Sequence, residues 1–227
     1  GTFKSESYWG GMADGIVDLA PLSAKVSADV AALVEERKQE MLDGKFKLFC
    51  GPIYGQNDEL VVPEGKCLSD PEQLSIDWFF QGVQGEAPKA PPAEAGGVAA
   101  PASAAAPSEE VKVAFVYVGP TGDLGWSYAH DQGRLALDDL GYVDSAFSEL
   151  VPEGPDAERV IRDYAEKGYD VIFATSFGYM DSVLNVAAEY PEVKFEHATG
   201  YKTADNVAIY DGRGYEGWYL AGMTAGL

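Results

Sequence analysis

The chain has 227 residues, of which 46% are hydrophobic, and its 37 acidic and 16 basic residues give a formal net charge of −21. This length allows one large globular domain or two small ones, and the negative charge argues against nucleic acid and anionic membrane surfaces as binding partners. No apolar run reaches the roughly 18 residues of a transmembrane helix, and the first residues lack a signal-peptide core, so the sequence predicts a soluble chain.

Residues 1–85 alternate short apolar stretches with glycine and proline, a pattern typical of short elements joined by turns. Pro21 ends one apolar stretch, and Gly44 follows apolar residues at helical spacing. In chain order these signals predict a strand at 15–20, a helix from 27 or 28 to about 42, a hairpin with strands at 46–49 and 60–62, and a capped helix start at 69–72.

Two cysteines, Cys50 and Cys67, flank the predicted hairpin. Neither belongs to a CxxC motif or a histidine-rich cluster, which argues against a zinc site. Because the hairpin brings the two thiols close together, we expect a disulfide, which implies an oxidising compartment. The alternative is a pair of buried free thiols.

Residues 86–110 are rich in alanine and proline and contain no aromatic residue. Such a composition cannot bury enough apolar surface to offset the entropy lost on ordering. The segment is therefore predicted to be a flexible linker, which as a coil spans about 25–30 Å.

Strands and helices alternate from Val111 onward. The apolar, β-branched run at 113–118 is typical of a strand buried on both faces of a parallel sheet. Further strands are predicted at 145–151, 169–176, 194–198 and 207–210, with helices at 126–140, 156–167, 180–190 and 215–227. This alternation predicts an α/β fold with a doubly wound, mainly parallel sheet between two helical layers.

The loop at 119–125 follows the first strand of this series, where open α/β sheets bind ligands beyond the carboxyl ends of their strands. Its three glycines do not form the GxGxxG dinucleotide fingerprint, and no Walker-type Gly-Lys-Ser/Thr sequence follows. No pair of histidines has metal-ligand spacing. The sequence therefore predicts neither a nucleotide cofactor nor a metal.

Asp123 and Trp126 lie where this loop enters the predicted helix. An indole offers a flat apolar face to an aromatic ligand, and a carboxylate accepts hydrogen bonds from ring N–H or amino groups. The alternative is that Asp123 caps the helix and Trp126 packs on the sheet. Ser176 and Phe177 end the third strand of the series, and there Phe177 either faces the ligand or covers the sheet edge.

Neither histidine lies near a recognisable serine or cysteine nucleophile motif. Structural roles are therefore expected for His130 and His197. Asp131 and Arg134, three residues apart, are expected to form an ion pair on the helix surface.

Residues 111–227 resemble the N-terminal lobe of the basic membrane protein family, the purine-nucleoside-receptor-like substrate-binding proteins of ABC transporters. The resemblance is carried by the stretches VAFVYVGPTGDLGWSYAHDQGR, GYDVIFATSFGYMD, VKFEHATGYKT and GRGYEGWYLAGMTAGL. Residues 1–85 resemble the C-terminal end of the same family through GTFKSESYWGGMADGIVDLAPL and FCGPIYGQNDELVVPEGKCLSDPEQLSIDWFFQGVQG. The order of the two segments is thus reversed, and the linker at 86–110 joins them.

The resemblance implies one circularly permuted lobe of a periplasmic-binding-protein type I fold, flavodoxin-like, in which residues 1–85 complete a single domain with 111–227. It implies capture of a small aromatic solute, a purine nucleoside or base, by a non-enzymatic protein whose parent is periplasmic or extracytoplasmic and docks on an ABC permease. By motif position, Asp123, Trp126, Ser176, Phe177 and Thr199 would line this half of the cleft.

The middle of the family's sequence, which would build the second lobe and complete the cleft, has no counterpart among these stretches. Its absence would expose Trp126 and Phe177 as an apolar patch, so we expect a tendency to form homodimers through this face. Two alternatives remain open. The chain is a scaffold lobe without retained binding, or it is an enzyme acting on nucleotides or nucleosides with Asp123 and His130 as its acid/base pair.

Overall fold

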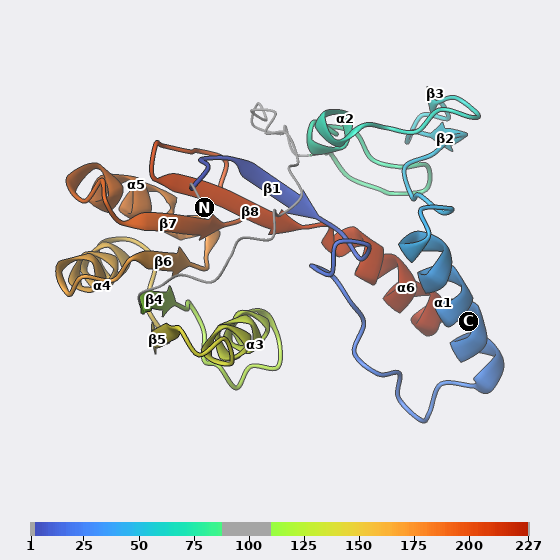
Figure 1. Cartoon of the computed structure of the whole chain (residues 1–227). Coiled ribbons are helices and arrows are strands. Elements are labelled where there is room, and N and C mark those ends of the chain that lie inside the picture. The colour runs from blue at the N-terminus through green and yellow to red at the C-terminus, as the bar shows by residue number, and fades with distance from the viewer. Residues whose placement is uncertain (1–2, 88–109, 227) are drawn as a thin grey trace. The chain divides into compact units, whose positions relative to one another are not determined.

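The computed structural model describes residues 3–87 and 110–226. Within them the contacts form two compact units, unit 1 at 3–9 and 110–211 and unit 2 at 10–87 and 212–226 (Figure 1). Residues 88–109 hold nearly all of the linker predicted at 86–110, and that prediction lies outside the described residues.

Unit 1 is built on a six-stranded sheet in the order β1-β8-β7-β6-β4-β5. The strands are β1 (Ser7–Gly10), β4 (Val111–Val116), β5 (Val143–Ser148), β6 (Val171–Ala174), β7 (Lys194–Ala198) and β8 (Val207–Gly212). Every pairing from β5 across to β8 is parallel. Counted along the chain from β4, these five strands lie in the order 2-1-3-4-5, which is the flavodoxin-like order.

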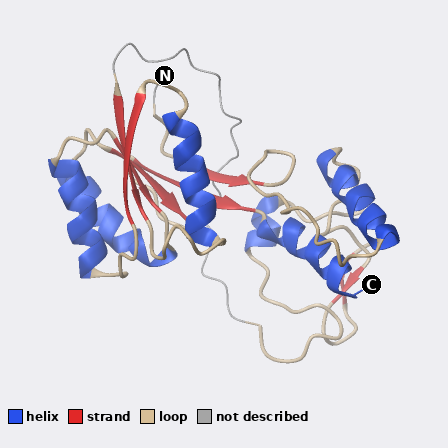
Figure 2. Cartoon of the chain, turned by 90° about the horizontal axis from the view of Figure 1, so that it is seen from below, coloured by secondary structure: helices blue, strands red, loops and turns tan. Residues whose placement is uncertain are grey.

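Helices cover both faces of this sheet (Figure 2). Because side chains alternate along a strand, Val116 and Ile172 point to the face covered by α4 (Pro155–Glu166) and α5 (Met180–Glu189). Phe115 and its neighbours point to the opposite face, which α3 (Trp126–Asp138) covers. The predicted doubly wound α/β/α architecture is therefore confirmed.

The predicted strands and helices of unit 1 are found within a few residues of their expected bounds. The largest shift is in the second strand, predicted at 145–151, which ends at Ser148. Glu149 lies outside the strand, and the chain bends at Leu150, which adopts a left-handed backbone with φ of 58°. This bend places them beside the loop that follows β4.

Unit 2 contains the helices α1 (Ala28–Leu42), α2 (Asp70–Leu74) and α6 (Gly214–Gly226) and a hairpin of β2 (Ile53–Tyr54) and β3 (Leu60–Val62). Val34 of α1 and Leu220 of α6 belong to its buried cluster. Gly44, with φ of +68°, ends α1 as expected, because it lets the Lys45 N–H donate to the Glu40 carbonyl at 2.8 Å.

Two predictions in the N-terminal segment are wrong. Residues 15–20 contain no strand: Gly15 ends a turn in which the Gly11 N–H donates to the Asp14 carboxylate at 2.8 Å, and residues 17–20 have no regular structure. The first hairpin strand lies at 53–54 instead of 46–49, since Phe46 and Leu48 pack against the α1–α6 cluster.

Unit 2 also contains the Cys50–Cys67 disulfide. At α2, Ser69 and Glu72 form the capping box that the sequence suggests, with the Ser69 N–H donating to the Glu72 carboxylate at 2.8 Å. This helix ends after five residues. Across the described residues, every helix is too short or too polar to cross a membrane.

Candidate functional site

The candidate site lies at the carboxyl edge of the unit 1 sheet. By this term we mean the segments that follow β4, β5, β6 and β7, up to and including the start of the next helix. The strand order reverses between β4 and β6, and open α/β sheets bind ligands at such a switch point. The Trp126 indole Nε1–H donates to the Thr175 carbonyl at 2.5 Å, which joins the segments that follow these two strands. Four of the five predicted site residues therefore flank the switch point.

Asp123 is held at the start of α3. Its carboxylate accepts backbone N–H groups of Gly125 at 2.7 Å, Tyr128 at 3.0 Å and Ser127 at 3.1 Å. These hydrogen bonds, that of Gly125 first, lower the pKa of Asp123. The geometry thus favours the capping alternative for Asp123, and the carboxylate keeps limited acceptor capacity for a ligand.

The indole N–H of Trp126 is hydrogen-bonded, but part of its ring is exposed to solvent. Its side chain remains 43% exposed although Nε1 is bound. The His130 ring lies 4.5 Å away between centroids, and its Nδ1 is 2.8 Å from the Trp126 carbonyl. Burial lowers the pKa of His130, so the imidazole is neutral at pH 7. Asp123 and His130 have different partners, and the acid/base pair of the enzyme alternative is not assembled.

Phe177 is the most exposed aromatic residue at this edge, with 58% of its surface accessible. It begins a short 3-10 turn, Phe177–Tyr179, after β6. The ring of Tyr201, from the segment after β7, lies 6.1 Å from it between centroids. The preceding Ser176 is buried and donates its hydroxyl to Glu153 at 2.6 Å.

Thr199 turns its hydroxyl toward the backbone, donating to the Ala198 carbonyl at 2.6 Å. Its backbone is left-handed, with φ of 62°. Leu124 and Leu150 share this conformation, so three of the four non-glycine residues with positive φ among those described lie at the carboxyl edge. Such residues cost about 1 kcal/mol or more each and cluster at ligand sites.

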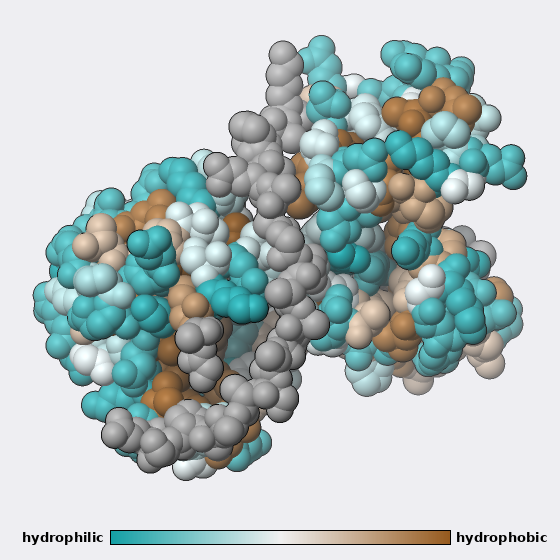
Figure 3. Space-filling model, turned by 45° about the horizontal axis from the view of Figure 1, so that its top comes forward, coloured by the Kyte–Doolittle hydropathy of each residue, from teal (hydrophilic) through white to brown (hydrophobic). Residues whose placement is uncertain are grey.

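Several residues of this edge are not apparent from the sequence. Leu124 and Leu150 are 83% and 62% exposed, and together with the aromatic residues they place apolar surface around the switch point. Brown, hydrophobic areas interrupt the teal surface of unit 1, the body at the left of Figure 3. Glu149 accepts the Thr121 N–H at 2.8 Å, so a carboxylate after β5 secures the loop after β4.

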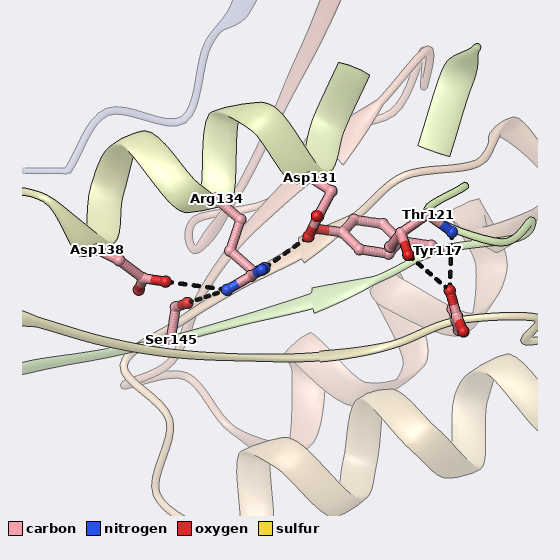
Figure 4. A network of polar contacts seen from close by, with 7 residues as sticks. Tyr117, Thr121, Asp131, Arg134, Asp138 and Ser145 are labelled. Atoms are coloured by element: carbon pink, nitrogen blue, oxygen red, sulfur yellow. Dashed lines mark hydrogen bonds and ion pairs between the residues drawn. The ribbon is translucent and has the colours of Figure 1, made fainter. Parts of the chain in front are cut away.

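A polar network joins α3 to Tyr117, the residue after β4, and to β5 (Figure 4). Arg134 donates to Asp131 at 2.7 Å, to Asp138 at 3.0 Å and to the Ser145 hydroxyl at 3.0 Å. The Tyr117 hydroxyl donates to the same Asp131 oxygen at 3.3 Å. The predicted Asp131–Arg134 pair is present, but it is not a surface pair, because the two side chains are only 13% and 11% exposed.

The carboxyl edge thus offers flat aromatic and apolar surfaces with a few bound polar groups, an arrangement suited to non-covalent recognition of a ring. In the part of the chain that the structure describes, no group of three or more His, Cys, Asp or Glu residues is placed to hold a metal ion.

Comparison with known proteins assigns the family. A family model described as ABC transporter substrate-binding protein PnrA-like matches residues 110–227. A purine-binding protein of Brucella abortus is 55% identical over 124 residues, which are 54% of this chain and 35% of that protein. A putative ABC transporter glucose-binding protein of Haloferax volcanii is 48% identical over 120 residues, or 52% of this chain and 30% of that protein.

Among solved structures, an ABC transporter solute-binding protein of Aeropyrum pernix K1 is 30% identical with a TM-score of 0.39, covering 44% of this chain and 28% of that one. The chain spans about a third of the length of the curated relatives that it matches. Since the family model covers more than half of the chain, the chain belongs to the PnrA-like family of ABC transporter substrate-binding proteins.

Proposed function

We propose that the carboxyl edge of unit 1 binds a purine base or nucleoside for an ABC permease. The observation that carries this proposal is the pair of partly exposed aromatic side chains at the switch point, Trp126 and Phe177. The name of the Brucella abortus relative supports a purine as the ligand. A sugar is the second candidate, since the Haloferax volcanii relative is named for glucose and sugar rings also lie on aromatic faces.

In this proposal Trp126 and Phe177 contact the ring of the solute. Asp123, Ser176 and Thr199 line the same half of the cleft, and their polar atoms are already bound to neighbouring groups. Those bonds fix the shape of the edge, so apolar contact supplies most of the affinity here. Because this family binds its solute between two lobes, one half of the cleft alone is expected to bind weakly.

We also propose that the chain is a circular permutation, in which residues 1–85 supply the family's C-terminal segment and 86–110 joins it to the N-terminal one. The pairing of the two ends supports this. In unit 1, β1 lies beside β8 in the sheet, and in unit 2, α1 packs against α6. The proposed protein is non-enzymatic, and its parent acts outside the cytoplasm.

Titration calorimetry tests the binding. We expect saturable heat with adenine or adenosine, and at least a tenfold weaker Kd in Trp126→Ala, because the aromatic contact is lost. The matched control is Trp218→Ala, since Trp218 is 82% exposed on α6 of unit 2. Heat with glucose alone would replace the purine by a sugar, and no heat with either would overturn the proposal.

Self-association through the carboxyl edge is a separate expectation. Sedimentation velocity at increasing concentration should show dimers, because apolar side chains are exposed there. Leu124→Asn should weaken dimerisation several-fold without loss of stability, since Asn adopts a left-handed backbone more readily than Leu. A chain that sediments as a monomer at every concentration would contradict this expectation.

A further inference from the structure

Ser176, directly before the exposed Phe177, is held from two sides. Its hydroxyl donates to Glu153 Oε1 at 2.6 Å, and its carbonyl accepts from His197 Nε2 at 2.7 Å. Glu153 Oε1 also accepts the Gly178 N–H at 3.1 Å. One carboxylate oxygen therefore binds the residues on both sides of Phe177, and we call Glu153, Ser176, Gly178 and His197 the Ser176 clamp.

Two glycines make room for the Ser176 clamp. A Cβ atom at position 178 would lie 2.1 Å from the Glu153 carboxyl carbon, so any larger residue would push the carboxylate away. A Cβ atom at position 200 would lie 2.3 Å from His197 Nδ1. The close approach of these side chains to backbone is typical of a segment whose position is fixed.

His197 is the buried member of the Ser176 clamp, with 1% of its surface exposed. Because a carbonyl oxygen can only accept, Nε2 must carry the proton. Burial lowers the pKa of His197, which keeps the ring neutral with that single N–H. At neutral pH the ring therefore donates this hydrogen bond to the Ser176 carbonyl.

Phe177 itself has little packing to hold it, since more than half of its surface is exposed. Its direction therefore depends on the backbone of the residues on either side, which the Ser176 clamp fixes. We propose that Glu153 is a positioning residue for ligand recognition, which sets the ring of Phe177 without touching the ligand. This inference rests on the proposed function of the carboxyl edge.

Calorimetry with adenosine on three variants tests this role. Glu153→Ala should weaken the Kd about tenfold, the equivalent of one charge-assisted hydrogen bond. Glu153→Gln should stay within about threefold of the unmodified chain, because the amide oxygen can accept both hydrogen bonds that Oε1 accepts. Glu166→Ala, which removes an exposed carboxylate of α4, is the matched control and should not change the Kd.

A double-mutant cycle separates positioning from general stability. If Glu153 acts through Phe177, then Glu153→Ala should cost no further affinity in a Phe177→Ala background. Hydrogen exchange provides a readout without ligand, in which the Gly178 amide should exchange at least tenfold faster in Glu153→Ala than in Glu153→Gln.

The outcomes are distinguishable. If the unmodified chain binds adenosine while Glu153→Ala keeps its affinity, or if the losses from Glu153→Ala and Phe177→Ala simply add, the positioning role is overturned and the proposed function stands. If the unmodified chain binds no purine or sugar, the proposed function fails and the positioning role fails with it.

Discussion

Replacing Arg134 with methionine is expected to lower the free energy of unfolding by about 3 kcal/mol, because it leaves the Asp131 carboxylate largely buried without its cation. Arg134 also lies over the Phe147 ring, 4.8 Å from its centroid, and donates to Ser145 on β5. Methionine retains much of the apolar contact, so the loss reports on charge and hydrogen bonding. Urea unfolding followed by circular dichroism at pH 7 measures it.

Two further variants identify the cause of that loss. Asp138, the other carboxylate that Arg134 contacts, is 38% exposed. Asp138→Asn should therefore lower the free energy of unfolding by less than about 1 kcal/mol. In the Arg134→Met and Asp131→Asn double variant, part of the stability should return, since no buried charge is left unpaired. If Arg134→Met unfolds like the unmodified chain, the network of Figure 4 is not a stabilising element of unit 1.

The sheet of unit 1 could be predicted from the sequence because its strands are buried on both faces. The run Val113-Ala114-Phe115-Val116 carries no polar residue, and both of its faces are covered by helices. The prediction failed in residues 15–20, where an apolar stretch follows a turn closed by the Asp14 side chain. Periodicity carries no information about such a side-chain contact.

The candidate site could be predicted only in part. Its place follows from the loop after the first strand, and the structure brings Asp123, Trp126, Ser176 and Phe177 to the switch point that this loop suggested. Glu153 could not be found, because its partners Ser176 and Gly178 lie 23 and 25 residues further along the chain. Glu149 was also missed, because the strand was predicted to continue to Val151. The strand ends at Ser148, and Glu149 accepts the Thr121 N–H.

The stability of unit 1 is also expected to fall as the pH rises through 7. Burial, and then the negative charge of Glu6, raises the pKa of Glu196 from 4.5 to about 7. The folded chain therefore holds a proton on Glu196 that the unfolded chain releases at lower pH. The resulting stabilisation is complete below pH 4.5 and is lost as the pH rises through about 7.

Glu196→Gln isolates this contribution, since glutamine stays neutral at every pH. Near pH 4.5 the variant and the unmodified chain should unfold at similar urea concentrations. At pH 8 the variant should be more stable by about 2 kcal/mol. This is less than the full pKa shift of Glu196 implies, because its side chain is partly exposed. Glu192→Gln, an exposed position that gives the same change in net charge, is the control. A gain of equal size in both variants would trace the effect to the net charge of −21 rather than to the burial of Glu196.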